Sequence, residues 1–203
     1  MKKIAFSIAL FFFQTVLYAQ IDSIKDPFDH LIAVVNGNLN KDNLPDKVIV
    51  TQDTLDKKAP YRLQIFFKEP GGQYKLIESS TQIIEPQYPD GNDGFYTGNS
   101  FLEITIKKAV FCIHNELLRG HYEYLFRYQH DRFELIGFSE SQSDGRGKMY
   151  YTDFNLVTGI KIRQTDNYET DKVISRIKTK QLIRPLPKLK DLVPFVNDHF
   201  LYE

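Results

Sequence analysis

The stretch Arg119-Gly-His-Tyr-Glu-Tyr-Leu-Phe-Arg-Tyr-Gln129 decides the fold class. Its aromatic residues fall at every second position, and mostly polar residues stand between them. Side chains of a β-strand point alternately to the two faces of a sheet, so this period predicts a strand with one buried aromatic face and one polar face. Asp131 then predicts a tight turn, and residues 133–139 return as the second strand of a hairpin.

The same alternation recurs on both sides of this hairpin, broken at short intervals by turn residues. Further strands are predicted at 31–35, 47–51, 61–68, 74–79, 101–106, 109–114, 148–156, 160–168 and 172–183. About ten short strands joined by short turns predict an all-β, antiparallel meander. A sandwich, a barrel and part of a propeller all remain open. A complete propeller is less favoured, because no clean internal repeat appears.

The two ends of the chain differ from this pattern. Lys2 and Lys3 precede an apolar run, and Ala19 follows, which is the order of a secretory signal peptide cleaved after residue 19. The run is too short for a membrane-spanning helix, which needs about 20 apolar residues. Residues 20–203 are predicted to form a single β domain, and its proline-rich tail, 185–203, is predicted to be largely irregular with at most a short terminal helix. The expected location is the periplasm or the cell exterior.

Composition limits the classes of partner. The whole chain has 26 basic and 26 acidic residues, and loss of Lys2 and Lys3 with the signal leaves a net charge of −2. A nearly neutral chain argues against nucleic acid or an anionic membrane as the main partner. No later apolar run has transmembrane length. Cys112 is the only cysteine, which excludes an intramolecular disulfide, and its apolar neighbours favour a buried small side chain.

One polar loop has the ligand spacing of a calcium site. Alternate positions of Asn38–Asp46 offer oxygen atoms to a cation, which suits calcium because it binds six to eight oxygens. The candidate metal ligands are Asn38, Asn40, Asp42, the main-chain carbonyl of Leu44, and Asp46. Asn43 tolerates the positive φ that such a loop needs after its fifth position. An asparagine- and aspartate-rich turn whose side chains bond its own backbone is the alternative, and the pattern leaves both open.

This loop resembles the Gly-Asp-x-Asn-x-Asp-Gly-x-x-Asp segment of FG-GAP and VCBS-type repeat proteins. The resemblance covers about ten residues and implies a calcium loop between two strands of a propeller blade. Asn38 stands in place of the first aspartate of that motif and Asn43 in place of its glycine. Fewer carboxylates imply a weaker affinity, with a dissociation constant of about 10⁻⁴–10⁻³ M or higher. Separately, the Tyr18-Ala-Gln20 end of the signal resembles exported proteins of the Bacteroidetes group.

No catalytic motif is recognised. The five histidines do not pair at a metal-ligand spacing, and the chain contains no Gly-x-Ser-x-Gly, phosphate-binding loop or dinucleotide fingerprint. The longest irregular stretch, 85–100, carries three aromatic residues that could contact a partner: Tyr88, Phe95 and Tyr96.

These observations predict a non-enzymatic, exported β domain that acts as a binding or interaction module of the bacterial envelope, with an unidentified protein or glycan as its partner. The alternative is a secreted hydrolase, with glycans as the candidate substrate, whose carboxylates come from separate strands. A purely structural envelope protein is the third interpretation.

Overall fold

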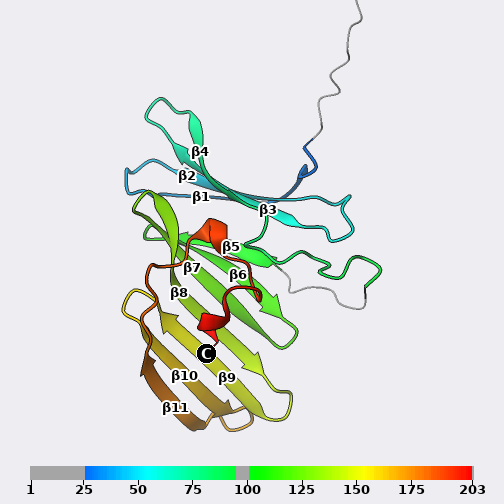
Figure 1. Cartoon of the computed structure of the whole chain (residues 1–203), viewed down its shortest axis with the longest axis vertical. Helices are drawn as coiled ribbons and strands as arrows, with labels where there is room; N and C mark the ends of the chain where they lie inside the picture. The colour runs from blue at the N-terminus through cyan, green and yellow to red at the C-terminus, as the bar shows by residue number, and fades with distance from the viewer. Residues whose placement is uncertain (1–25, 95–100, 203) are drawn as a thin grey trace, which may run out of the picture.

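The computed structural model describes residues 26–94 and 101–202, and it confirms the all-β prediction (Figure 1). Eleven antiparallel strands form two sheets. The strands are β1 (His30–Gly37), β2 (Asp46–Gln52), β3 (Tyr61–Lys68), β4 (Tyr74–Ser80), β5 (Phe101–Lys107), β6 (Val110–Leu117), β7 (Gly120–Gln129), β8 (Arg132–Ser143), β9 (Lys148–Asn155), β10 (Ile160–Asn167) and β11 (Val173–Lys180).

Both sheets are meanders in which each strand pairs with the next one along the chain. The first sheet has the order β1-β2-β3-β4, and the second has the order β11-β10-β9-β8-β7-β6-β5. The predicted hairpin of 119–139 is β7 and β8, paired from Gly120↔Gln142 to Gln129↔Arg132. Neither sheet closes into a barrel, because each keeps two edge strands.

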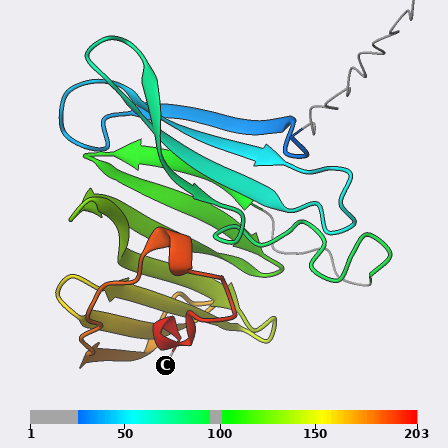
Figure 2. The same ribbon diagram turned by 45° about the horizontal axis from the view of Figure 1, so that its top comes forward.

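The core lies between the two sheets, and its largest fully buried side chains are aromatic. Tyr122, Tyr124 and Phe126 of β7 are fully buried on one face, as the period-two pattern predicts. Phe67 of β3 contacts Tyr128 edge to face, with ring centroids 4.8 Å apart, and so joins the two sheets. Burying one such side chain stabilises the fold by about 1.5–3 kcal/mol. Figure 2 shows the four-stranded sheet lying across the β5–β6 end of the larger one.

The C-terminal tail covers the rest of the aromatic face (Figure 1). Its described part has two 3₁₀ turns, η1 (Leu189–Asp191) and η2 (His199–Leu201), and is otherwise irregular. The hydroxyl of Tyr124 donates a hydrogen bond of 2.6 Å to the buried Asp198. The buried Lys161 donates one of 3.0 Å to the main-chain oxygen of Phe200. Because Leu189, Leu192 and Leu201 are buried, the tail is part of the core.

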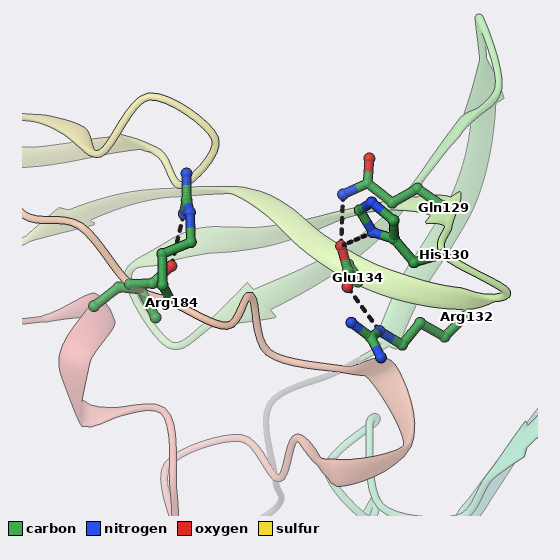
Figure 3. Close-up of polar contacts among 6 residues, drawn as sticks. Gln129, His130, Arg132, Glu134 and Arg184 are labelled. Carbon is green, nitrogen blue, oxygen red and sulfur yellow. Dashed lines mark hydrogen bonds and ion pairs between the residues drawn. The ribbon is translucent and has the colours of Figure 1, made fainter.

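A buried carboxylate lies at the β7–β8 turn (Figure 3). Glu134 is 3% exposed and accepts hydrogen bonds from Gln129 at 2.6 Å and from Arg132 at 2.7 Å, with His130 at 3.4 Å. Burial acts to raise the pKa of Glu134, but these hydrogen bonds outweigh it and lower the pKa below its ordinary value. Arg184, in the same view, donates to the main-chain oxygens of residues 156 and 157 and so anchors the start of the tail.

Strand β11 contrasts with this covered region. All eight of its residues are exposed, and it is one of the two edge strands of the larger sheet. Arg176, Lys178 and Lys180 lie on one face of the strand, because they alternate with residues of the other face. In the parts of the chain that the structure describes, no helix has the length and apolar character needed to cross a membrane.

Candidate functional site

The loop predicted to hold calcium joins β1 to β2. Asp46 begins β2 and is fully buried. Its carboxylate accepts backbone N–H bonds from Leu39 at 2.7 Å and Asn40 at 3.4 Å on one oxygen, and from Lys68 at 3.1 Å on the other. Burial raises the pKa of Asp46 despite these three bonds. Asp46 therefore fastens the loop to the neighbouring strand β3.

The other side chains of this loop also bond within it. Asn38 Oδ1 accepts from the backbone N–H of Lys41 at 2.6 Å, and Asn40 Oδ1 accepts from that of Asp42 at 3.0 Å. The carboxylate of Asp42 accepts from the Leu44 N–H at 2.8 Å and from the Asn40 amide at 2.8 Å. A cation would have to compete with these donors. Calcium binding at this loop stays a prediction.

The backbone of the loop has the conformation expected of its asparagines. Asn43 has a φ of 67°, and Lys41 has a φ of 68°. Asparagine is one of the few residues that adopt this region at low cost. The prediction for Asn43 is thereby confirmed. The positive φ of Asn43 is expected both for a calcium-binding loop and for a turn held by its own side chains.

The aromatic residues predicted to contact a partner are only partly described. Tyr88 is partly buried, and its hydroxyl accepts a hydrogen bond of 3.2 Å from Gln87. Phe95 and Tyr96 lie outside the described residues. The contact surface predicted at 85–100 therefore stays a prediction.

The polar face of the larger sheet carries a row of polar side chains that cross the strands. The pairing register sets Glu103, His114, Glu123, Ser139 and Asp153 side by side on β5 to β9. These residues alternate with the buried aromatic ones, so all five point away from the core. Neighbouring strands of a sheet are about 4.8 Å apart, which places consecutive members of this row in reach of one another.

Four side chains of this face form a continuous chain of hydrogen bonds. His114 Nε2 is 2.9 Å from Thr105 Oγ1, and His114 Nδ1 is 2.9 Å from Glu123 Oε1. Ser139 Oγ donates to Glu123 Oε2 at 3.0 Å. Both ring nitrogens and both carboxylate oxygens therefore have partners. Half-buried polar groups with this many partners are held in fixed positions.

Cys112 projects from the same polar face of the sheet. Its apolar neighbours predicted a buried side chain, but the side chain is only partly buried. Cys112 lies two residues before His114 on β6, so both side chains project on one side. Burial, together with the carboxylates of Glu123 and Glu103, raises the pKa of the Cys112 thiol to about 12. A thiol with so high a pKa is a poor nucleophile.

Two adjoining hollows lie on this polar face, with volumes of about 400 Å³ and about 480 Å³. Ser139 and Asp153 line both of them. Gly137 lies in the second hollow and has no side chain to fill it. The first hollow is also lined by His121, Ser141, Tyr151, Gln164, Asp166 and Arg176, and the second by Glu123, Leu125, Arg127, Asn155 and Thr158.

Sequence reasoning did not find this face, because its members come from five or more strands. The available signal was local. Cys112 and His114 are two residues apart on one strand, and the β6–β7 turn at residues 117–120 pairs His114 with Glu123. The hollows depend on the pairing of β8 with β9 and of β9 with β10, which no short motif encodes.

Comparisons with family models, with curated proteins and with solved structures found no match for this chain.

Proposed function

We propose that this chain is an exported, non-enzymatic binding module and that the two hollows on the polar face of the larger sheet hold its ligand. The observation that carries the proposal is that the hollows adjoin through Ser139 and Asp153 and so form one extended recess. Recesses with convergent polar groups are the usual sites for small or extended ligands.

The lining favours a neutral, hydroxyl-rich ligand such as a glycan chain. Gln164, Ser141 and His121 can each donate or accept hydrogen bonds, and Arg176 balances part of the charge of Asp166 in the first hollow. Tyr151 is 38% exposed there and offers an aromatic face on which a sugar ring can stack. Such mixed polarity does not select a strongly charged ligand.

The test is a binding screen of the purified protein against a panel of neutral oligosaccharides, followed by calorimetry on any ligand that binds. Tyr151→Ala is expected to weaken binding by about tenfold or more, which corresponds to about 1.4 kcal/mol. Tyr74→Ala is the matched control, because Tyr74 is 39% exposed and lies on the other sheet. Equal affinities of the two variants would overturn the placement of the ligand in the recess.

A hydrolase is the second candidate, and one observation favours it. Glu123 and Asp153 stand on the same face on either side of Ser139, so their backbones are about two strand spacings, or about 10 Å, apart. Inverting glycosidases hold their two carboxyl groups about 6.5–9.5 Å apart. Release of reducing ends from the same oligosaccharides, abolished by Asp153→Asn, would favour this candidate. Binding without release would favour the binding module.

A further inference from the structure

Strands β6 and β7 bring three different metal-binding side chains together. One ligand atom each from Cys112, His114 and Glu123 lies within 4.8 Å of the other two. The cause is the register: Cys112 and His114 share a face of β6, and His114 pairs directly with Glu123 of β7. Within residues 26–94 and 101–202, this is the one group of three such side chains.

The three ligand types together select a particular class of metal. Thiolate, imidazole and carboxylate are the ligands that zinc uses in proteins, whereas calcium and magnesium take oxygen ligands. Zinc bonds of about 2.0–2.3 Å in a tetrahedral site place ligand atoms about 3.3–3.8 Å apart. His114 Nδ1 and Glu123 Oε1 are 2.9 Å apart, and no separation in the group exceeds 4.8 Å. Changes of side-chain rotamer that move the ligand atoms by about 1 Å would therefore close the site, while the backbone of the sheet stays in place.

The surroundings of the group have the features of an outer coordination shell. Thr105 Oγ1 is 2.9 Å from His114 Nε2, so a metal bound at Nδ1 beside Glu123 would leave the other ring nitrogen with a partner that orients the ring. Ser139 holds the second oxygen of Glu123. Such partners orient metal ligands and commonly change metal affinity by about 10–100-fold when they are removed.

The charge around the group also favours a cation. Glu103 pairs directly with His114 from β5 and is exposed, so it adds a second carboxylate beside the thiol. Within residues 26–94 and 101–202, no lysine or arginine forms an ion pair with His114 or Glu123. A divalent cation would neutralise this concentration of negative charge.

We propose that Cys112, His114 and Glu123 form a zinc site on the polar face, with its fourth position filled by water or by Glu103. The site is distinct from the glycan-binding proposal, because its ligands bind a metal whether or not a glycan is present. Glu123 also lines the second hollow, so the metal would lie at the rim of that recess.

The test is zinc binding by the full chain after removal of metals with a chelator, measured by calorimetry and by elemental analysis. About one zinc per chain is expected. Cobalt substitution should give the near-ultraviolet absorption of a thiolate–cobalt bond, which reports Cys112 directly. Absence of stoichiometric zinc from the folded chain would overturn the proposal.

Variants separate this site from adventitious binding elsewhere. Cys112→Ser is nearly isosteric and is expected to weaken zinc binding by more than about 100-fold and to abolish the cobalt–thiolate band, while Thr105→Val should weaken it by about tenfold. His121→Gln is the matched control, because His121 is exposed on the same face of β7 and outside the group. Circular dichroism confirms that each variant is folded. Zinc binding that survives Cys112→Ser or that is lost with His121→Gln would also overturn the proposal.

Discussion

The loop at 38–46 and the group of Cys112, His114 and Glu123 both gather side chains that can bind a metal, but the two sets lie in opposite settings. In the loop, the side-chain oxygens accept hydrogen bonds from backbone N–H groups that no sheet partner satisfies. On β6 and β7, the ladder already satisfies the backbone, so the side chains pair with one another. Polar side chains in a turn are thus used to hydrogen-bond backbone N–H groups. Polar side chains on paired strands are free of that task and can bind one another or a ligand.

The largest expected effect tests the loop side of this comparison. Asp46→Ala leaves three N–H groups without an acceptor beside a buried position, and we expect the free energy of unfolding to fall by about 4 kcal/mol. Urea denaturation measures this loss. Asp42→Ala is the control, because Asp42 is exposed, and it should cost about 1 kcal/mol. Equal costs would show that Asp46 does not fasten the loop to β3.

A second effect concerns Glu134. Its carboxylate accepts hydrogen bonds from residues of its own turn, as the carboxylate of Asp46 does from residues of its loop. Because hydrogen bonds hold the folded-state pKa of Glu134 below its ordinary value, its contribution is present above about pH 4.3 and is lost as the pH falls through the folded-state pKa. Glu134→Gln is expected to cost about 2 kcal/mol at pH 7 and much less at pH 3. Urea denaturation at both pH values checks this.

The control for that measurement is Glu69→Gln, an exposed position between β3 and β4. It should change the free energy of unfolding by less than about 0.5 kcal/mol at either pH. A cost of Glu134→Gln that stays constant between pH 7 and pH 3 would contradict the assigned direction of the pKa shift.

A third effect tests a polar contact between distant parts of the chain. Tyr124→Phe removes the hydrogen bond to Asp198 and leaves that buried carboxylate without its donor, so we expect a loss of about 1.5 kcal/mol. Thermal melts or urea denaturation report it. Tyr151→Phe on the exposed face should cost less than about 0.5 kcal/mol. Indistinguishable melts would mean that the tail does not depend on this bond.

The smallest expected effect is that of calcium on the loop. With a dissociation constant of about 1 mM or higher, 10 mM calcium stabilises the fold by at most about 1.4 kcal/mol. The melting temperature in calcium, relative to that in chelator, should therefore rise by a few degrees at most, and Asp42→Ala should remove the rise. A much larger rise would mean that calcium displaces the loop's own donors. A rise that Asp42→Ala retains would place the calcium elsewhere.

The parts of the fold predicted from the sequence are those set by local patterns. The aromatic alternation of 119–129 predicts β7 because burial of one face of a strand selects that period, and three prolines predict the irregular tail. The division into two sheets was left open, because the pattern of strands and turns fits a sandwich, a barrel and part of a propeller alike. It depends on the segment between β4 and β5, whose described residues do not pair with the first sheet, so that β5 begins the second sheet.

The candidate site was beyond sequence reasoning for a related reason. His114 meets Glu123 through the β6–β7 turn, and Glu123 meets Ser139 through the β7–β8 register, which contains a bulge near Leu125. One residue of slip in either hairpin would turn these side chains to the opposite face. The role of Asp46 was likewise hidden, since one of its donors, Lys68, comes from a strand 22 residues away.

The cationic edge at β11 bears on how these molecules behave when concentrated. Two copies that met symmetrically along this edge would place arginine and lysine side chains directly opposite one another, because Arg176, Lys178 and Lys180 share a face. That repulsion discourages growth of a continuous sheet from molecule to molecule. The fully exposed strand therefore acts as a guard against polymerisation at high protein concentration.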